Sequence, residues 1–176
     1  MGHTLSASSP DEEAFVRAGE FFGYKFVTRS SDKVVLNIHG DVQEFSILHI
    51  LAYNQMRKRM SVVVRDAEGN VRLYVKGADT VIMERLEAGA VSPKERTTTR
   101  DCLATWGNDG LRTLCFAYRD LSEEEYSSWS QRYLEARGSV EEIEKRKQKL
   151  PNQIDAVRCH VRVQVRPRMG SVPFAS

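Results

Sequence analysis

A series of short strand-like segments between Tyr24 and Lys76 constrains the fold more than any other feature of this sequence. The segments alternate apolar and polar residues or hold short apolar runs, and turns rich in Ser, Asp, Asn and Gly separate them. Strands joined by such short turns pair antiparallel with their chain neighbours. The sequence therefore predicts a meander with strands at 24–29, 33–38, 42–53, 59–65 and 71–76, of which 42–53 is expected to be buried.

Helical signals flank this meander on both sides. Ser9-Pro10-Asp11-Glu12 has the form of a capping box with a proline at the first helical position, and it predicts a helix over 10–22 that ends at Gly23. After the meander, Asp79 is expected to cap a short helix over 80–86. The remaining segments predict a capped helix from Ser92 to about Trp106, a strand over 111–118 buried on both faces, and a capped helix that starts at Ser122 and extends as far as residue 149.

This order of elements predicts an α+β fold, a twisted antiparallel sheet of about six or seven strands flanked by helices. The 176 residues suit one domain with a short appendage. We divide the chain into an N-terminal extension (1–8), one domain (9–149) and a basic tail (150–176). Residues 149–176 hold five basic side chains against one acidic, and the alternation over 157–165 predicts a strand there.

Composition argues against several classes of protein. Every apolar run is far shorter than the roughly 20 residues of a membrane span, and the N-terminus lacks the pattern of a secretory signal. We therefore expect an intracellular chain with reduced thiols. Cysteine and histidine are too scattered for a zinc site, and we expect no metal ligands; they stand at Cys102, Cys115, Cys159, His3, His39, His49 and His160.

The motif that carries chemistry is Lys76-Gly77-Ala78-Asp79, at the junction of a strand and a helix. A lysine at a strand end supplies a positive charge, a glycine lets a ligand approach the backbone, and a helix start favours anions. Four residues are a weak signal alone. An ordinary turn with a solvated lysine would look the same.

Three further motifs accompany it in a specific order. The first is Ser9-Pro10-Asp11-Glu12. The second is Asn54 followed by Arg57-Lys58-Arg59-Met60-Ser61-Val62-Val63-Val64, and the third is Asp109-Gly110-Leu111-Arg112-Thr113-Leu114. With this set, the chain resembles over about residues 6–121 the nucleotide-binding (N) domain of type IV P-type ATPases, the phospholipid flippases. The Lys-Gly-Ala and Gly-Leu-Arg elements resemble P-type ATPases in general, whereas Arg-Lys-Arg-Met-Ser and Ser-Pro-Asp-Glu resemble the lipid-transporting branch.

The resemblance implies four ATP-binding residues. Tyr53 stands where the family has a phenylalanine that stacks on adenine, and Glu12 matches an acid near the purine. Lys76 matches a lysine deep in the adenosine pocket, and Arg112 matches an arginine that binds the phosphates. Further candidates for polar or backbone contacts to ATP are Asn54, Ser61, Gly77 and Ala78.

Each assignment has a structural alternative. Glu12 also completes a capping box, Tyr53 also suits a core aromatic at a strand end, and Arg112 also suits a salt bridge on an edge strand. Residues 57–59 are expected to form a solvated turn or internal ion pairs rather than a phosphate cradle.

The resemblance also implies a division of labour. The sequence contains neither the Asp-Lys-Thr-Gly-Thr element that P-type ATPases phosphorylate nor the acids that hold magnesium, so we assign no catalytic residue. The implied role is to hold ATP and present its γ-phosphate to an aspartate elsewhere in a parent transporter. ATP hydrolysis, Mg²⁺ and lipid transport then belong to that parent, whose phosphorylation, actuator and membrane domains are the expected partners, and the fragment alone is expected to be inactive.

Two rival functions remain open. One is a catalytically silent regulatory or scaffold fragment with the same fold. The other is nucleic-acid binding through 57–59 and the tail, which the net charge of +2 makes unexpected. A flippase accessory subunit and phospholipid are expected only through the parent, and the chain is expected to be a cytosolic domain of a membrane protein.

The tail departs from the family pattern, because residues 151–176 lack the Gly-Ala/Val-Thr-Ala-Ile-Glu-Asp element that normally follows. We favour unrelated sequence after about Lys149 over a divergent short protein. A terminal strand of the sheet is then expected to be lost or replaced.

Overall fold

The structure is a computed structural model that describes residues 10–86, 89, 91–138 and 162–166. In this part of the chain the helices are α1 (Pro10–Phe21), α2 (Asp79–Met83), α3 (Pro93–Asn108) and α4 (Glu123–Gly138). The strands are β1 (Tyr24–Arg29), β2 (Lys33–Ile38), β3 (Asp41–Leu51), β4 (Arg59–Arg65), β5 (Val71–Gly77), β6 (Arg112–Leu121) and β7 (Arg162–Arg166).

All seven strands form one sheet in chain order, and every neighbouring pair is antiparallel. The predicted meander and the α+β class are therefore confirmed. The seventh strand comes from the stretch that we separated as a tail, since Arg166 of β7 lies opposite Arg112 of β6. The domain division itself stays a prediction, and so does the strand period over 157–161, which lies outside the described residues.

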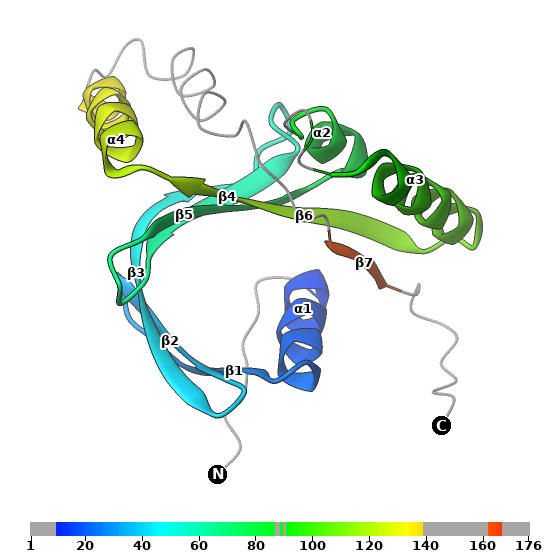
Figure 1. Cartoon of the computed structure of the whole chain (residues 1–176), viewed down its shortest axis with the longest axis horizontal. Coiled ribbons are helices and arrows are strands. Elements are labelled where there is room, and N and C mark those ends of the chain that lie inside the picture. Colours follow the sequence, from blue (N-terminus) through cyan, green and yellow to red (C-terminus); the bar gives the residue numbers. More distant parts are fainter. Residues whose placement is uncertain (1–9, 87–88, 90, 139–161, 167–176) are drawn as a thin grey trace.

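The helices are divided unequally between the two faces of the curved sheet. In Figure 1, α2, α3 and α4 lie on one side of the sheet, whereas α1 lies inside the curve on the other. We call the first the helix-covered face and the second the open face. Side chains alternate between these faces along each strand, so the register assigns every strand residue to one of them.

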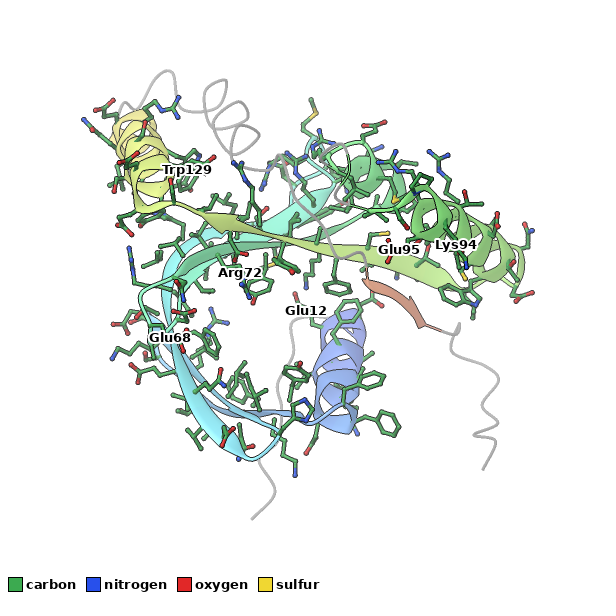
Figure 2. The ribbon with its side chains drawn as sticks, in the orientation of Figure 1. Glu12, Glu68, Arg72, Lys94, Glu95 and Trp129 are labelled. Carbon is green, nitrogen blue, oxygen red and sulfur yellow. The ribbon has the colours of Figure 1, made fainter. Side chains whose placement is uncertain are left out.

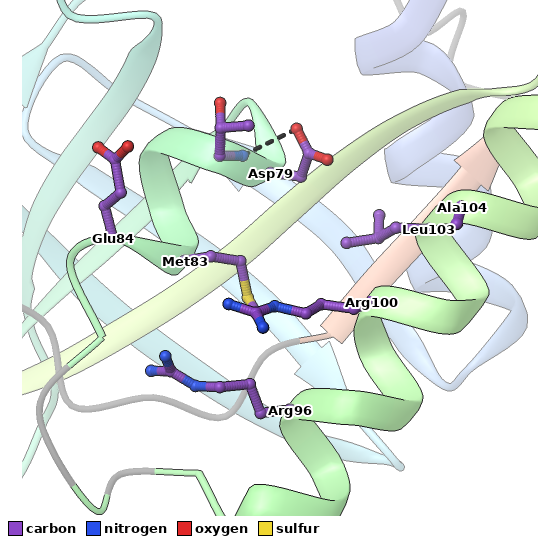
Figure 3. A pocket seen from close by; sticks show the side chains of 8 residues that line it. Asp79, Met83, Glu84, Arg96, Arg100, Leu103 and Ala104 are labelled. Atoms are coloured by element: carbon purple, nitrogen blue, oxygen red, sulfur yellow. Dashed lines mark hydrogen bonds between the residues drawn. The ribbon is translucent and has the colours of Figure 1, made fainter.

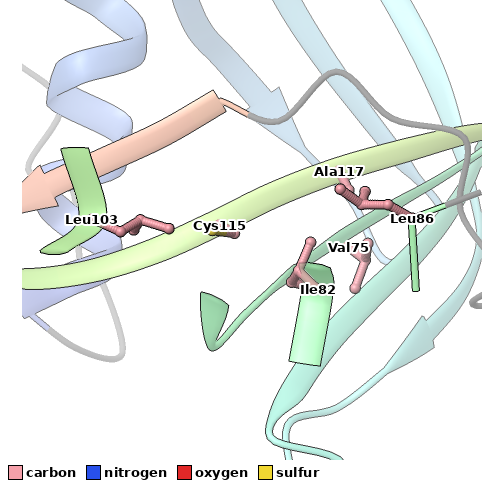
Figure 4. Close-up of a cluster of buried hydrophobic side chains, with 6 residues drawn as sticks. All are labelled: Val75, Ile82, Leu86, Leu103, Cys115 and Ala117. Carbon is pink, nitrogen blue, oxygen red and sulfur yellow. The ribbon is translucent and has the colours of Figure 1, made fainter. Parts of the chain in front are cut away.

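The hydrophobic core lies on the helix-covered face. Six residues from β5, β6, the α2 segment and α3 form one buried cluster: Val75, Ile82, Leu86, Leu103, Cys115 and Ala117 (Figure 4). A second cluster packs α4 on the same face through Trp129, which is 2% exposed, against Leu51, Val63, Val71, Leu73 and Leu121 (Figure 2). Both clusters lie on the side of the sheet away from the open face.

Two burial expectations are wrong. The strand over 42–53 was expected to be buried, but β3 is largely exposed or half-buried, its first four residues are exposed on both faces, and only Leu51 is fully buried. The strand over 111–118 was expected to be buried on both faces, but in β6 only Cys115, Ala117 and Leu121 are buried. These three residues share the helix-covered face, so the β6 residues that point the other way keep contact with solvent.

The helix ends test the capping predictions. The capping box at Ser92 is confirmed, because its side chain accepts from the Glu95 N–H and Glu95 accepts from the Ser92 N–H. Gly23 follows α1 with a positive φ of 86°, as expected of a helix stop. The start of that helix is not tested, since Ser9 lies outside the described residues.

Two further helix ends differ from expectation. The N-cap of α2 is Ala78 and not Asp79, which is the first helical residue and accepts from the Thr80 N–H. The Ala78 N–H donates to the Lys58 carbonyl, and the helix begins directly after Ala78, one residue earlier than predicted. The helix α2 also ends at Met83, three residues before the predicted Leu86.

Candidate functional site

Three of the predicted site residues, Glu12, Lys76 and Arg112, meet on the open face at the first turn of α1. The Lys76 ammonium lies 3.2 Å from a Glu12 carboxylate oxygen, although the two residues are far apart in sequence (Figure 2). The same ammonium lies 5.4 Å from the centre of the Phe15 ring. Phe15 packs edge-on against Phe116, with 5.0 Å between ring centres. The structure therefore joins α1, β5 and β6 around Lys76.

Arg112 reaches the same turn of α1 by a second ion pair. Its guanidinium lies 3.3 Å from Asp11, with 75% of the Arg112 side chain and 21% of the Asp11 side chain exposed. A pair this open to solvent contributes at most about 1 kcal/mol, so an anionic ligand could displace the carboxylate at small cost. Glu12 and Lys76 are also partly exposed, at 35% and 26%.

Tyr53 lies in the turn between β3 and β4, which leaves the sheet at the same end as Lys76. The register shows this, because Leu51 pairs with Ser61 of β4, and Met60 of β4 pairs with Lys76 of β5. Tyr53 is 56% exposed, so it is not the core aromatic of the structural alternative. Its ring is accessible for stacking on a flat ligand.

The further candidates have structural contacts of their own. The Asn54 side chain accepts a hydrogen bond from the Arg57 N–H at 2.7 Å. Ser61 is 1% exposed and pairs with Leu51 and Val75, which places it on the helix-covered face. The structure therefore separates Ser61 from the open-face site.

Gly77 and Ala78 meet the turn before β4. A Cβ atom on Gly77 would lie 2.6 Å from the Arg59 Cβ and 2.7 Å from the Lys58 carbonyl oxygen. The Ala78 N–H donates to that same carbonyl at 3.2 Å. Glycine at this position thus allows the chain itself to approach, whereas the sequence motif suggested the approach of a ligand.

For residues 57–59 the expected solvated turn is wrong for both arginines, whereas the alternative of internal ion pairs stays a prediction. Arg57 and Arg59 are 4% and 1% exposed, so they do not form a solvated turn. Their guanidinium groups donate to backbone carbonyl oxygens, Arg57 to Ala52 and Arg59 to Arg57. Carbonyl groups at a strand end accept such hydrogen bonds because they leave the sheet without a strand partner.

Several open-face residues were missed in the sequence. Asp11 and Phe15 stand beside Glu12 and one turn after it, and this helical spacing was the signal that could have identified them. The aromatic side chains of the sheet gave no such signal, because only the register places Phe116 opposite Lys76 and Tyr118 opposite Tyr74. Tyr74 and Tyr118 lie next to each other, with 6.2 Å between ring centres.

The open face is electrostatically balanced farther along the sheet. The Arg72 guanidinium donates to Asp120 at 2.5 Å and lies 4.9 Å from the centre of the Tyr118 ring (Figure 2). The hydrogen bond with Asp120 raises the pKa of Arg72 above its usual range. This arginine is therefore held by its partner, unlike the more exposed Arg112.

A separate hollow lies on the helix-covered face, between α2 and α3 (Figure 3). Its lining includes two acids and two arginines together with apolar side chains: Asp79, Thr80, Met83, Glu84, Arg96, Arg100, Leu103 and Ala104. It contains none of the predicted ATP-binding residues, and the sheet separates it from α1. The balanced charge of its lining gives no reason to place the nucleotide there.

The described residues do not fit a metal site. Within them, no group of three or more His, Cys, Asp or Glu side chains is close enough to hold an ion.

No helix in the described part of the chain is long and apolar enough to span a membrane.

Similarity to known proteins agrees with this geometry. A family model of the P-type ATPase cytoplasmic domain N matches residues 3–150. The chain is 45% identical over 130 residues to phospholipid-transporting ATPase IK of Mus musculus, and 46% identical over 132 residues to phospholipid-transporting ATPase DRS2 of Saccharomyces cerevisiae. It is 44% identical over 130 residues to phospholipid-transporting ATPase ID of Homo sapiens.

These matches cover most of the chain but little of the relatives. Each includes 74% of this chain and 10% or 11% of the relative. The chain thus spans about a tenth of the length of the curated relatives it matches. Taken with the α+β sheet, the match over residues 3–150 shows that the chain belongs to the type IV P-type ATPases, the phospholipid-transporting branch, as their N domain.

Proposed function

We propose that this domain binds ATP on the open face of its sheet, between the first turn of α1 and the turn that carries Tyr53. The observation that carries the proposal is the contact of Glu12 with Lys76 at 3.2 Å. It brings two of the residues implied by the resemblance together from segments 64 positions apart, beside Arg112 and its partner Asp11.

The chemistry of these groups suits the parts of ATP. An aromatic ring such as Tyr53 can stack on adenine, and a carboxylate such as Glu12 can accept a hydrogen bond from the adenine amino group. Lys76, beside Glu12, can donate to the adenosine, and Arg112 can donate charge-assisted hydrogen bonds to phosphate oxygens. The phosphates would displace the Asp11 carboxylate beside Arg112 at small cost.

In this proposal the domain holds ATP and presents the γ-phosphate to an aspartate of a phosphorylation domain. Positioning contributes much of the catalysis of phosphoryl transfer, so a domain without a nucleophile still serves the reaction. Magnesium would arrive with the nucleotide. Phosphorylation, ATP hydrolysis and phospholipid transport, together with the actuator, membrane and accessory partners, belong to the proposed full-length transporter.

Titration of ATP into the purified chain, followed by amide chemical shifts and calorimetry, tests the site. We expect shifts around Tyr53, Lys76 and Arg112. Lys76→Ala removes a charge-assisted hydrogen bond and should weaken ATP binding by about 10- to 100-fold. Tyr53→Ala removes a stacked ring and should weaken it by about three- to tenfold.

Two exposed residues away from the site provide matched controls. Lys94 lies at the start of α3 on the helix-covered face (Figure 2), and Tyr24 begins β1. Lys94→Ala and Tyr24→Ala should leave ATP affinity unchanged. If saturating ATP causes no shifts, the domain is a silent scaffold with the same fold, which is the rival reading. Wild-type affinity in both site variants would refute the site assignment.

A further inference from the structure

We propose that Arg57 is a positioning residue for the nucleotide site, which holds the 52–58 turn in the conformation that presents Tyr53. The inference rests on the proposed function, because it names a residue that acts on ATP through Tyr53. Arg57 lies four residues after Tyr53 and yet is 4% exposed, whereas Tyr53 itself is 56% exposed. The turn therefore has a buried anchor and an exposed aromatic.

The guanidinium of Arg57 connects both ends of the turn. One of its nitrogens donates to the Ala52 carbonyl at 3.3 Å, directly before Tyr53. Another donates to the Ser61 hydroxyl at 3.2 Å, on β4. A planar guanidinium presents several donors in fixed directions, so it can hold two segments at one relative position.

The backbone of the turn is closed around the same residue. The Arg57 N–H donates to the Asn54 side chain at 2.7 Å, and the Lys58 N–H donates to the Asn54 carbonyl at 2.9 Å. Lys58 adopts a positive φ of 51°, which is unfavourable for a residue with a side chain. Such a conformation persists only where the surroundings impose it.

A second arginine fixes the turn to the strand that carries Lys76. Arg59 is 1% exposed, donates to the Arg57 carbonyl at 3.0 Å, and pairs with Gly77 directly after Lys76. The turn with Tyr53 and the strand end with Lys76 are thus parts of one packed unit. Arg57 controls the position of the adenine-stacking ring without touching the nucleotide.

The first test needs no nucleotide. Arg57→Met keeps an unbranched apolar stem but removes the donors, and Arg57→Lys keeps the positive charge but not the planar guanidinium. In both variants the backbone amides of residues 57 and 58 should exchange their hydrogens with solvent at least about tenfold faster than in the wild type. Arg65→Met is the control, because Arg65 is the last residue of β4 and lies at the end of that strand away from the 52–58 turn. In this variant, hydrogen exchange in the turn should not change.

The second test is a double-mutant cycle on ATP affinity. Arg57→Met alone should weaken ATP binding by about three- to tenfold, as Tyr53→Ala does. Because Arg57 acts through Tyr53, the double variant should bind no more weakly than Tyr53→Ala alone. Strictly multiplied losses, or unchanged amide exchange in both Arg57 variants, would overturn the inference.

The outcomes separate this inference from the function on which it rests. A wild-type chain that does not bind ATP refutes the proposed function. A chain that binds ATP through Tyr53 but is indifferent to Arg57→Met refutes only the positioning role. Amide spectra of each variant show whether the fold is intact, and Arg57→Lys provides the milder substitution if Arg57→Met unfolds.

Discussion

At the scale of single residues, the site depends on side chains whose surroundings the sequence does not reveal. Lys76 could be predicted as a site residue from its motif, and in the structure it contacts Glu12, which belongs to another of the motifs. Arg57 and Arg59 could not, because arginines in a polar run normally lie in solvent. Their guanidinium groups donate to backbone carbonyls within five residues along the chain, in a turn conformation that the residue pattern does not show.

Gly77 offers a test at this scale of the close approach between β4 and β5. Gly77→Ala should destabilise the fold by about 1–3 kcal/mol, because the added Cβ meets backbone and cannot be accommodated by rotating a side chain. Gly107→Ala in α3 is the control: no atom lies within 4 Å of its added Cβ, so this change should stabilise by about 0.5–1 kcal/mol. Urea unfolding of both variants measures the difference, and equal effects would contradict the packing argument.

At the scale of elements, local signals predicted what local interactions determine. The capping box at Ser92 and the left-handed stop at Gly23 are confirmed, since each depends on residues within one turn. The predicted cap of α2 was wrong because the Ala78 N–H donates to the Lys58 carbonyl, a contact with the turn before β4 that the local sequence does not show. The predicted burial of β3 was wrong because an apolar strand pattern does not show how far along the strand other elements pack against it.

The helix α4 is attached to the sheet by an ion pair that should make its docking depend on pH. Arg65 donates to both carboxylate oxygens of Glu123, at 2.8 and 3.0 Å. These bonds lower the pKa of Glu123 from its ordinary value of 4.5. The stabilisation is therefore present above pH 4.5 and is lost as pH falls through the lower, folded-state pKa.

We expect Glu123→Gln to be less stable than the wild type at neutral pH and equally stable in acid. Urea unfolding at a series of pH values between about 7 and 3 measures this convergence. Glu124→Gln is the control, since Glu124 shares the same helix start but should show a smaller difference at neutral pH. A Glu123→Gln penalty that persists unchanged at the lowest pH would refute the role of the ion pair.

At the scale of the whole molecule, the order of elements in the sequence predicted the α+β class and the location of the helices in the chain. The alternation over 157–165 also predicted a strand where β7 lies, but not its pairing with β6, because these residues depart from the family pattern. A strand needs only backbone groups to pair with an open sheet edge, so an unfamiliar sequence can fill this place.

Cys115 provides a probe of the whole fold because it lies in the centre of the core. It is 0% exposed, and burial raises the pKa of its thiol to about 11, with the charge of Asp79 adding to the effect. In a chain with Cys102 and Cys159 replaced by Ser, a thiol reagent should label Cys115 only through unfolding. If ATP binds only the folded chain, ATP at about 100 times its Kd should slow labelling about a hundredfold. Rapid labelling in native buffer would contradict this core position.

The strand order from β1 to β7 has a consequence for folding. Each strand after β1 pairs with the strand that precedes it in the sequence. Most contacts within the sheet therefore join segments of low sequence separation, a topology associated with fast folding. Only two closures are long, across residues 78–111 between β5 and β6 and across 122–161 between β6 and β7. Closing these long loops costs more conformational entropy than closing the short turns that join β1 to β5. We therefore expect β1 to β5 to assemble first, with the turn that carries Tyr53 already closed before β6 joins.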